Sequence, residues 1–391
     1  MKLISQAKQK IGIFGLGLTG QSVYEALLNI ADLIICWDDS EKNRNAFSDN
    51  YNQNDLVDIT CKSWLELDKI VISPGVPHIH PIFLLAKNHN ILISSDIQLF
   101  LEENKNSKIV AITGTNGKST TTALVGHLLK SNNYDYHVGG NIGVPILQLP
   151  VNAQGYILEL SSFQLDLLYN FNPDIAVLLN ITPDHFDRYA NFEAYVASKF
   201  KVFNGDGVKI ISIDTPILKD FYFNLKAKYD KKVISISTNP SRYGIVCTSH
   251  TIKDNVVDKK KYDIPIFDNL LGNHNLENIA AAFAVCKMLG LTSQQIIRNL
   301  GNFQGLKHRM QYLGKKNHIK YYNDSKATNA TSAAVALNTL SNIYWLAGGI
   351  FKEESFAPID HGLASINRAY LFGKDKMLFA EYLENKVKYD L

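Results

Sequence analysis

Apolar residues in the first part of this chain form short runs separated by amphipathic stretches. The runs IGIF (11–14), LIICW (33–37), KIVIS (69–73) and ILISS (91–95) have the length of buried strands. Strands that alternate with helical segments predict a parallel sheet with helical crossover connections. The first ninety or so residues are therefore expected to form an α/β unit.

The same alternation begins again after the polar stretch EENKNSK (102–108). Strands are expected at 108–113, 155–160, 175–181 and 208–213, and helices over 118–130, 192–203 and 275–290. The lysine-rich segment 254–266 is interpreted as a solvated loop or hairpin. This second series predicts another parallel sheet.

A third unit is expected to begin near Gly305. Its expected elements are strands at 319–324, 342–349 and 368–373, a helix over 329–340 and a last helix from 376. The sequence therefore predicts an α/β protein with three successive units.

Composition and charge restrict the classes of function that the chain could have. A length of 391 residues allows two or three cores, and 40 basic against 37 acidic residues give a net charge of +3, less than expected for a chain that binds nucleic acid mainly through a basic surface. Neither a signal peptide nor an apolar run of membrane-spanning length is found. The cysteines, interpreted as buried free thiols, are Cys36, Cys61, Cys247 and Cys286. A cytoplasmic protein that does not enter a membrane is expected.

A first glycine-rich turn, GLGLTG (15–20), follows a strand and opens a helix. Glycines allow a tight turn and close approach of a ligand to the backbone, and the helix N-terminus attracts anions. Asp38 and Asp39 follow the next strand, where dinucleotide folds place a ribose-binding acid. This turn alone is compatible with an NAD-dependent oxidoreductase, but any diphosphate ligand can use it.

A second phosphate loop, TGTNGKST (113–120), also lies between a strand and a helix. Lys118 can reach β- and γ-phosphates, and Ser119 or Thr120 can offer a hydroxyl to magnesium. The strict GxxxxGK[ST] pattern is not met, because Ile112 occupies the position of its first glycine. Two phosphate loops predict two phosphorylated ligands, and a dehydrogenase has no use for the second.

Candidate magnesium ligands lie near the carboxyl ends of two expected strands. Glu159 is near the end of one strand, and Asp184, His185 and Asp187 come just after another. Magnesium prefers oxygen ligands and retains several waters, so one or two carboxylates together with phosphate oxygens suffice. A hydrogen-bonded loop histidine remains the alternative for His185.

Lys199 occupies the apolar face of the expected 192–203 helix, together with Tyr195, Val196 and Phe203. Such a lysine usually extends its ammonium group to water. If buried, it would have a lowered pKa and a nucleophilic amine. Reaction of that amine with CO2 would give a carbamate, an oxygen ligand suited to magnesium.

Taken together, these motifs resemble the Mur ligase family, and within it the members that add D-glutamate to UDP-N-acetylmuramoyl-L-alanine. The matching segments are GLGLTG (15–20), SPGVP (73–77), TGTNGKST (113–120), GGNIG (139–143), LELSSFQL (158–165), NITPDHFDRY (180–189), GNHNLEN (272–278), GLKHRM (305–310) and NDSKATN (323–329). They occur in family order over more than 300 residues.

The resemblance implies an N-terminal Rossmann-like UDP-sugar-binding domain (1–95), a central P-loop ATPase-type domain (96–304) and a C-terminal Rossmann-like amino-acid-binding domain (305–391). Family members continue for several tens of residues beyond the LFGKDK-like segment, so the last domain is expected to be truncated. An inactive descendant that still binds UDP-sugar or ATP is therefore the alternative to an active ligase.

The resemblance also implies site residues. Those matched to the UDP-sugar are Gly15, Leu18, Thr19, Gly20, Asp38, Asp39, Ser73, Asn141 and Ser161. Those matched to ATP are Gly114, Thr115, Asn116, Gly117, Lys118, Ser119, Thr120, Asn275, Asn278, His308, Arg309 and Asp324. Those matched to D-glutamate are Lys326, Thr328 and Lys352. The expected ligands of two magnesium ions are Ser119, Glu159, His185 and Lys199 as its carbamate, and the expected catalytic residues are Lys118, His185 and Lys199.

The implied reaction is an ATP-dependent ligation in peptidoglycan precursor synthesis. The alanyl carboxylate attacks the γ-phosphate of ATP, and the D-glutamate amine then displaces phosphate from the acyl phosphate. Phosphorylation supplies the leaving group that a carboxylate lacks, and the positive charge of magnesium and Lys118 offsets the charge between two anionic reactants. A monomer is expected.

Overall fold

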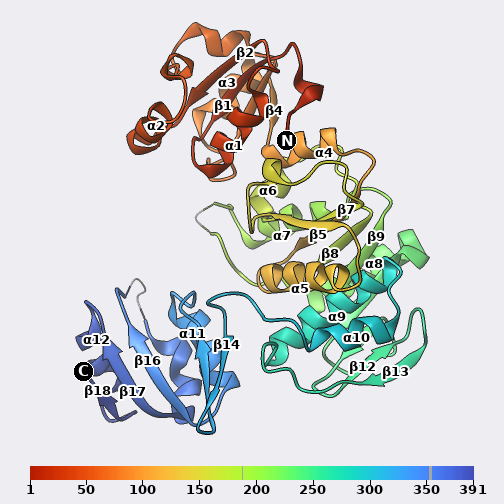
Figure 1. The fold of residues 1–391 in the computed structure, drawn as a ribbon, viewed down its shortest axis with the longest axis vertical. Helices are drawn as coiled ribbons and strands as arrows, with labels where there is room; N and C mark the ends of the chain where they lie inside the picture. Colours follow the sequence, from red (N-terminus) through yellow and green to blue (C-terminus); the bar gives the residue numbers. More distant parts are fainter. Residues whose placement is uncertain (187, 352–354) are drawn as a thin grey trace. The chain divides into compact units, whose positions relative to one another are not determined.

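The fold is described from a computed structural model that covers residues 1–186, 188–351 and 355–391 (Figure 1). Contacts within the chain define two compact units. The first comprises Met1–Asp263 and Glu277–Asn299, and the second comprises Ile264–Leu276 and Leu300–Leu391.

The N-terminal part of the first unit is a parallel sheet flanked by helices. Its strands are β1 (Lys10–Phe14), β2 (Leu33–Trp37), β3 (Lys69–Ile72) and β4 (Leu92–Ser94), in the order β2-β1-β3-β4. Its helices are α1 (Leu18–Leu27), α2 (Glu41–Ser48), α3 (Pro81–Asn88) and α4 (Asp96–Glu103). Because β2 and β3 lie on opposite sides of β1, the β1–α1 turn lies where the chain changes direction at the carboxyl edge of the sheet, the place at which open α/β sheets bind ligands.

A larger sheet with the order β13-β12-β11-β10-β9-β8-β5-β7-β6 forms the rest of the first unit. Its strands are β5 (Lys108–Thr113), β6 (Tyr136–Gly140), β7 (Gly155–Glu159), β8 (Ile175–Leu178), β9 (Val208–Ser212), β10 (Val233–Ser237), β11 (Ile245–Cys247), β12 (Thr251–Asp254) and β13 (Lys260–Asp263). The strands from β6 to β11 pair in parallel, and β12 and β13 are antiparallel additions. The chain switches from one side of β5 to the other at β7 and β8, so the carboxyl ends of these strands define the expected site.

Helices α5 (Lys118–Lys130), α6 (Ser162–Asp166), α7 (Phe192–Phe200), α8 (Pro216–Tyr229), α9 (Asn273–Met288) and α10 (Ser293–Leu300) accompany this sheet. One cluster of buried apolar side chains includes Ile11 and Val23 of the first sheet and its helix as well as Leu158 and Leu178 of the second sheet. The two sheets of the first unit therefore share a hydrophobic core.

The second unit contains an antiparallel pair, β14 (Gln311–Lys316) and β15 (Ile319–Asn323), and a parallel sheet in the order β16-β17-β18. The strands of this sheet are β16 (Ile343–Gly348), β17 (Ile366–Phe372) and β18 (Tyr389–Asp390), and the helices are α11 (Ala330–Thr339) and α12 (Lys376–Leu383). Ala347, Ala369 and Leu371 belong to the buried core, whereas Leu346 and Phe372 are exposed. Alternate residues of the sheet thus face opposite sides, of which one is packed.

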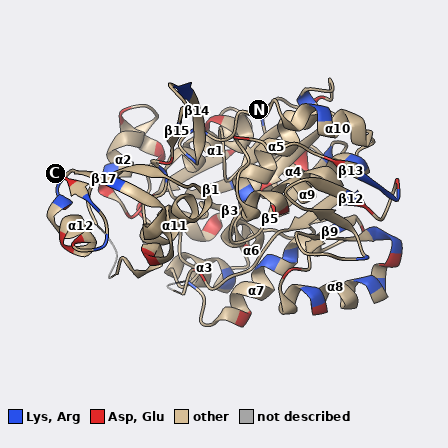
Figure 2. Ribbon diagram, turned by 90° about the horizontal axis from the view of Figure 1, so that it is seen from below, with Lys and Arg blue, Asp and Glu red and all other residues tan. Residues whose placement is uncertain are grey.

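Most of the predicted elements are present. The α/β class and the parallel sheets are confirmed, and the lysine-rich segment is a hairpin, β12–β13, with basic residues along β13 (Figure 2). Strands β6, β10, β11, β14 and β18 and helices α6, α8 and α10 were not predicted. The division into domains at 95 and 304 stays a prediction.

One expectation about solvent exposure is corrected: Cys61 is exposed, while the other cysteines are buried as expected. For Lys199, whose ammonium group could extend to water or lie in the interior, the structure shows the buried alternative, with an exposed fraction of 2%. Among the helices of the described residues, none combines the length and apolar character needed to cross a membrane.

Candidate active site

The first glycine-rich turn lines a cavity of about 470 Å³ in the first unit. Gly15 has a φ of +96°, and a Cβ on Gly20 would lie 1.9 Å from the Gly15 carbonyl oxygen. Glycine is therefore required at both positions for this turn to bring α1 against β1. Of the residues matched to the UDP-sugar, Gly15, Leu18, Thr19, Asp38, Asp39 and Ser73 line this cavity.

The two acidic residues that follow β2 have different surroundings. The carboxylate of Asp38 accepts hydrogen bonds from the backbone N–H groups of Leu16 (2.6 Å) and Ser40 (2.8 Å), so it stabilises the turn. Asp39 is more exposed, and its carboxylate lies 3.0 Å from His80 Nε2. Because His80 Nδ1 accepts from the Ile82 N–H, Nε2 is the nitrogen that donates to Asp39. His80 also lines the cavity, although it was not predicted from the sequence.

The second phosphate loop connects β5 to α5. Its backbone turns at Gly114 and at Gly117, which has a φ of +81° and directly precedes α5. The Lys118 Nζ donates to the carbonyl oxygens of Gly114 (2.9 Å) and Thr115 (2.8 Å). The lysine is thus folded over the loop, where its charge would meet phosphate groups at the N-terminus of α5.

Lys199 contacts the same loop from α7. Its Nζ donates to the Gly114 carbonyl oxygen at 2.8 Å and lies 4.7 Å from the ring centre of Tyr195. Burial, reinforced by the neighbouring Lys118 ammonium and opposed by Asp184, lowers the pKa of Lys199 to about 7. A large fraction of the amine is therefore neutral near pH 7, which is the form that reacts as a nucleophile.

Glu159 is a buried carboxylate at the end of β7. Its Oε1 accepts a hydrogen bond from Asn141 Nδ2 at 3.0 Å, whereas its Oε2 is buried without a hydrogen-bond partner. A buried oxygen of this kind is suited to a cation or an ordered water. Asn141 and Ser161, both matched to the UDP-sugar, lie at the β6 and β7 ends; Ser161 forms the capping box of α6 with Gln164.

His185 follows β8 with a φ of +55°, and its Nε2 lies 3.4 Å from the Asp184 carboxylate. Its ring lies 4.8 Å from that of Phe163 and 6.0 Å from that of Tyr195. Tyr195 therefore connects His185, Lys199 and Thr115, whose Oγ1 is 3.0 Å from the Tyr195 hydroxyl. Within the described ranges no three His, Cys, Asp or Glu side chains form a cluster that could hold a metal ion by themselves.

Arg188 was not recognised from the sequence. Its guanidinium lies 3.9 Å from the ring centre of Phe163 and donates to the carbonyl oxygens of Gly75 and Val76, the latter at 2.7 Å. Those carbonyls belong to the SPGVP segment that lines the first cavity. The signal was present, since NITPDHFDRY includes Arg188, but only tertiary structure shows the contact.

The second unit brings together several residues matched to ATP and D-glutamate. The His308 carbonyl oxygen accepts from the Lys326 N–H at 3.0 Å, and the Asp324 carboxylate accepts from the Met310 N–H at 2.8 Å. Burial raises the pKa of Asp324. Arg309 and Thr328 lie in the same two segments, and Asn275 lies at the start of α9, where its side chain donates to the Leu271 carbonyl. Lys352 lies outside the described residues.

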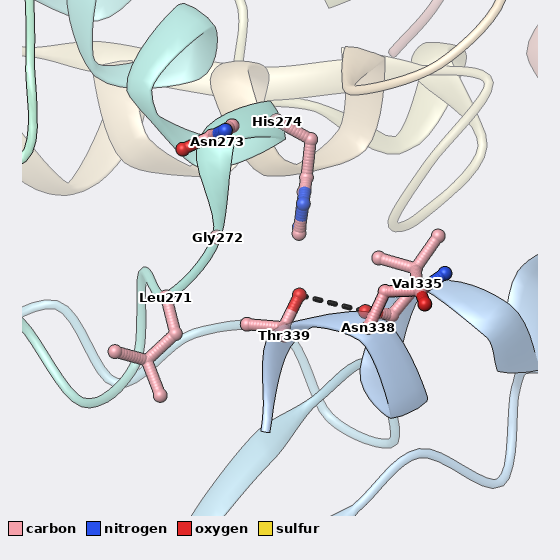
Figure 3. Close-up of a pocket in the computed structure, with 7 residues that line it drawn as sticks. All are labelled: Leu271, Gly272, Asn273, His274, Val335, Asn338 and Thr339. Carbon is pink, nitrogen blue, oxygen red and sulfur yellow. Dashed lines mark hydrogen bonds between the residues drawn. The ribbon is translucent and has the colours of Figure 1, made fainter. Parts of the chain in front are cut away.

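A separate cavity of about 460 Å³ lies in the second unit (Figure 3). It is lined by Leu271, Gly272, Asn273, His274, Val335, Asn338 and Thr339. Burial lowers the pKa of His274, and Thr339 Oγ1 donates to the Val335 carbonyl oxygen at 2.6 Å. No residue predicted for the site lines this cavity.

Comparisons with known proteins agree with the geometry. Residues 112–286 match the model of the Mur ligase middle domain. The UDP-N-acetylmuramoylalanine–D-glutamate ligase of Rickettsia prowazekii (strain Madrid E) is 49% identical over 386 residues, which covers 98% of this chain and 86% of that protein. The ligase of the same name from Wolbachia pipientis wMel is 37% identical, in an alignment that covers 100% of this chain and 87% of that protein.

Solved structures show the same fold at lower identity. The UDP-N-acetylmuramate-alanine ligase of Thermotoga maritima superposes with a TM-score of 0.60 at 18% identity, covering 98% of this chain and 90% of that one. The MurF ligase of Thermotoga maritima, solved in complex with ADP, superposes with a TM-score of 0.57 at 17% identity, covering 99% and 92%.

Proposed function

The chain belongs to the Mur ligase family, among its UDP-N-acetylmuramoylalanine–D-glutamate ligases. From this premise we propose which of its residues bind each substrate and the magnesium ions. It is an ATP-dependent ligase that forms an amide bond in the synthesis of peptidoglycan precursors. The observation that carries this conclusion is the 49% identity over nearly the whole chain. The phosphate loop and the buried Lys199 beside it support the site assignment.

The reaction proceeds in two steps. The alanyl carboxylate of UDP-N-acetylmuramoyl-L-alanine attacks the γ-phosphorus of ATP, so that a new P–O bond forms and ADP leaves. The D-glutamate amine then attacks the acyl carbon, and phosphate leaves as the C–N bond forms and the amine loses a proton. Both reactants of the first step are anionic, so the site must supply positive charge.

Residues 114–120 are assigned to the ATP phosphates. The N-terminus of α5 directs backbone N–H groups at this position, and Lys118 adds a full positive charge that is held over the loop by two carbonyl oxygens. As negative charge develops on the transferring phosphoryl group, Lys118 neutralises it. Asn275 and Asn278 are proposed to hold the nucleotide, with His308, Arg309 and Asp324 contributing from the second unit.

Magnesium accompanies ATP in this family's reaction, and we assign Ser119, Glu159, His185 and a carbamate on Lys199 as ligands for two ions. The buried, unpartnered Oε2 of Glu159 fits this role. Bound magnesium would supply charge neutralisation at the phosphate oxygens. Because the described residues offer few side-chain ligands in one place, phosphate oxygens and water are expected to complete the coordination.

The carbamate follows from the chemistry of Lys199. A neutral amine adds to CO2 and releases one proton, which leaves an anionic carboxylate on a nitrogen that retains one hydrogen. That hydrogen can still donate to the Gly114 carbonyl oxygen, which lies 2.8 Å from Nζ. Burial and the lowered pKa of Lys199 provide the neutral amine that this reaction requires.

The cavity at 15–20 is assigned to the UDP-sugar. Its backbone turn suits a diphosphate, and Asp39, oriented by His80, can accept hydrogen bonds from a uridine group. Asn141 and Ser161 are proposed to contact the same substrate nearer the phosphate loop. Lys326, Thr328 and Lys352 are proposed to bind the D-glutamate carboxylates.

One assay tests the proposed activity: phosphate release with ATP, magnesium, UDP-N-acetylmuramoyl-L-alanine and D-glutamate, with each component omitted in turn. We expect release only when all four are present. No release from the complete mixture would contradict ligase activity of this polypeptide. A monomeric state and a cytoplasmic location stay predictions, which size-exclusion chromatography and fractionation of cells can test.

A further inference from the structure

Asn180, in the segment after β8, holds the phosphate loop by three hydrogen bonds. Its backbone carbonyl oxygen accepts from the Thr115 N–H at 2.8 Å. Its side-chain Oδ1 accepts from the Asn116 N–H at 2.8 Å, and its Nδ2 donates to the Asn116 carbonyl oxygen at 3.2 Å. The conformation of the loop at Asn116 therefore depends on how the Asn180 carboxamide is oriented.

Glu277, on α9, contacts that carboxamide from the other side. Its Oε2 accepts a hydrogen bond from Asn180 Nδ2 at 2.7 Å. The Glu277 side chain is largely buried, and burial raises its pKa, while hydrogen bonds with Asn180 and Ser212 favour its ionised form. A buried carboxylate at this position needs a donor, and Asn180 supplies it.

The chemistry of the pair fixes the direction of the amide. Glu277 Oε2 accepts from Asn180 Nδ2, and a carboxyl oxygen that carries no proton can only accept, so the NH2 end of Asn180 faces Glu277. The carbonyl end of the same amide then faces the loop, where the Asn116 N–H needs an acceptor. Reversal of the amide would place NH2 against N–H and carbonyl against carboxylate, two unfavourable contacts at once.

The residue that follows Glu277 holds the other end of the loop. Asn278 Oδ1 accepts from Thr121 Oγ1 at 3.0 Å and would lie 2.3 Å from a Cβ placed on Gly117. Neighbouring residues of α9 thus hold both sides of the phosphate loop. The chain passes from the second unit to the first between Leu276 and Glu277.

We propose that Glu277 is a positioning residue for the ATP-phosphate loop, which it orients through Asn180 from the point on α9 where the chain passes from the second unit to the first. This inference rests on the assignment of 114–120 to ATP under the proposed function. Its consequence is that ATP binding depends on α9, which contributes residues to both units. No contact between Glu277 and substrate is required.

The test is steady-state kinetics of the full chain with Glu277→Leu, Glu277→Met and Glu277→Gln. Leu and Met remove the acceptor while keeping the space filled, so the KM for ATP should rise about tenfold with each. The KM values for UDP-N-acetylmuramoyl-L-alanine and D-glutamate should stay within about twofold. Gln retains a carbonyl that can accept from Asn180, and its KM for ATP should stay within about threefold of wild type.

Two further variants separate positioning from general loss of a buried acid. Asp96→Asn alters a buried carboxylate of α4 outside this network and should leave the KM for ATP unchanged. In an Asn180→Ala background, Glu277→Leu should have no further effect on the KM for ATP, because the connection is already broken.

The outcomes distinguish this inference from the proposed function. A wild-type chain without ATP-dependent ligation contradicts the proposed function itself. An active wild type with an unchanged KM for ATP in folded Glu277→Leu or Glu277→Met overturns only the role of Glu277. Equal increases in all three KM values would also overturn it, because they would indicate general distortion of the fold.

Discussion

The Lys199 ammonium group and the carbonyl oxygen of Gly114 are joined by a hydrogen bond of 2.8 Å. Gly114 of the phosphate loop is thereby bound to a buried amine on α7. Because Lys118 Nζ donates to the same carbonyl at 2.9 Å, two lysines converge on one oxygen. The burial of Lys199 and, to a lesser degree, its repulsion by Lys118 favour loss of a proton from Lys199, the condition for carbamate formation.

Replacement of Lys199 by alanine should abolish ligation, and short carboxylates such as acetate or formate should restore part of it. The reason is that a free carboxylate can occupy the space of the lost carbamate and supply an anionic oxygen. Phosphate release with and without the added acid measures the effect. Full activity of Lys199→Ala without any additive would refute the carbamate assignment.

The lowered pKa of Lys199 also predicts a pH-dependent stability. The unfolded chain binds this proton up to pH 10.5 and the folded chain only up to about pH 7. Between these values the unfolded state binds more protons, so this group makes the free energy of unfolding rise with pH. Below pH 7 the buried Lys199 is charged, and its charge lowers the free energy of unfolding by the full amount.

Lys199→Met removes that penalty. The free energy of unfolding of the variant minus that of wild type should therefore be most favourable to the variant at pH 6.5, and this difference should fall by about 3 kcal/mol by pH 9.5. Urea unfolding in CO2-free buffer at both pH values provides the measurement. Lys219→Met, at an exposed position of α8, is the control and should show no such trend. A pH-independent difference for Lys199→Met would contradict the neutral amine.

Lys118→Met should reduce kcat/KM by about a thousandfold, because the charge that neutralises the transferring phosphoryl group is lost. Binding of the UDP-sugar, measured by calorimetry, should remain within about twofold of wild type, since that cavity is formed by other residues. Lys130→Met, in the last turn of the same helix, serves as the matched control. A comparable loss in both variants would argue against a specific role for Lys118.

Substitutions of two glycines in the first turn should have different effects, one on stability and the other on binding of the UDP-sugar. A Cβ at position 20 would lie 1.9 Å from the Gly15 carbonyl oxygen, so Gly20→Ala should lose about 1–3 kcal/mol of unfolding free energy. A Cβ at position 17 would have no neighbour within 4 Å, and Gly17 has a φ of −67°. Gly17→Ala should therefore unfold like wild type but raise the KM for the UDP-sugar.

Thermal unfolding and kinetics of the two glycine variants, measured side by side, check this prediction. Equal destabilisation by both would show that the turn tolerates no side chain at either position. An unchanged KM for the UDP-sugar in Gly17→Ala would place the diphosphate elsewhere.

The phosphate loops were predictable because their signals are local. In each, a short apolar strand, glycines and a helix start lie within about twenty residues of one another, and the structure places both loops as predicted. Strand β6 (Tyr136–Gly140) was not predicted, because its sequence, YHVGG, lacks an apolar run and ends in two glycines. Its place at the sheet edge reflects pairing with β7 rather than propensity.

The environment of Lys199 and the contact between Glu277 and Asn180 could not be predicted in the same way. Helical spacing placed Lys199 on an apolar face but left two outcomes open, water or the interior, and only the packing of α7 decides between them. Glu277 and Asn180 are 97 residues apart in the sequence. Their contact depends on where α9 lies relative to the end of β8, which no local pattern encodes.

The second unit is assembled from two segments, Ile264–Leu276 and Leu300–Leu391, and this has a consequence during translation. The first segment leaves the ribosome before the second has been made, and roughly ninety further residues must be added after residue 300. At about 5–20 residues per second this takes on the order of 5–20 s. During that interval the nascent first unit can fold, while Ile264–Leu276 has no folded partner segment and is accessible to chaperones or proteases.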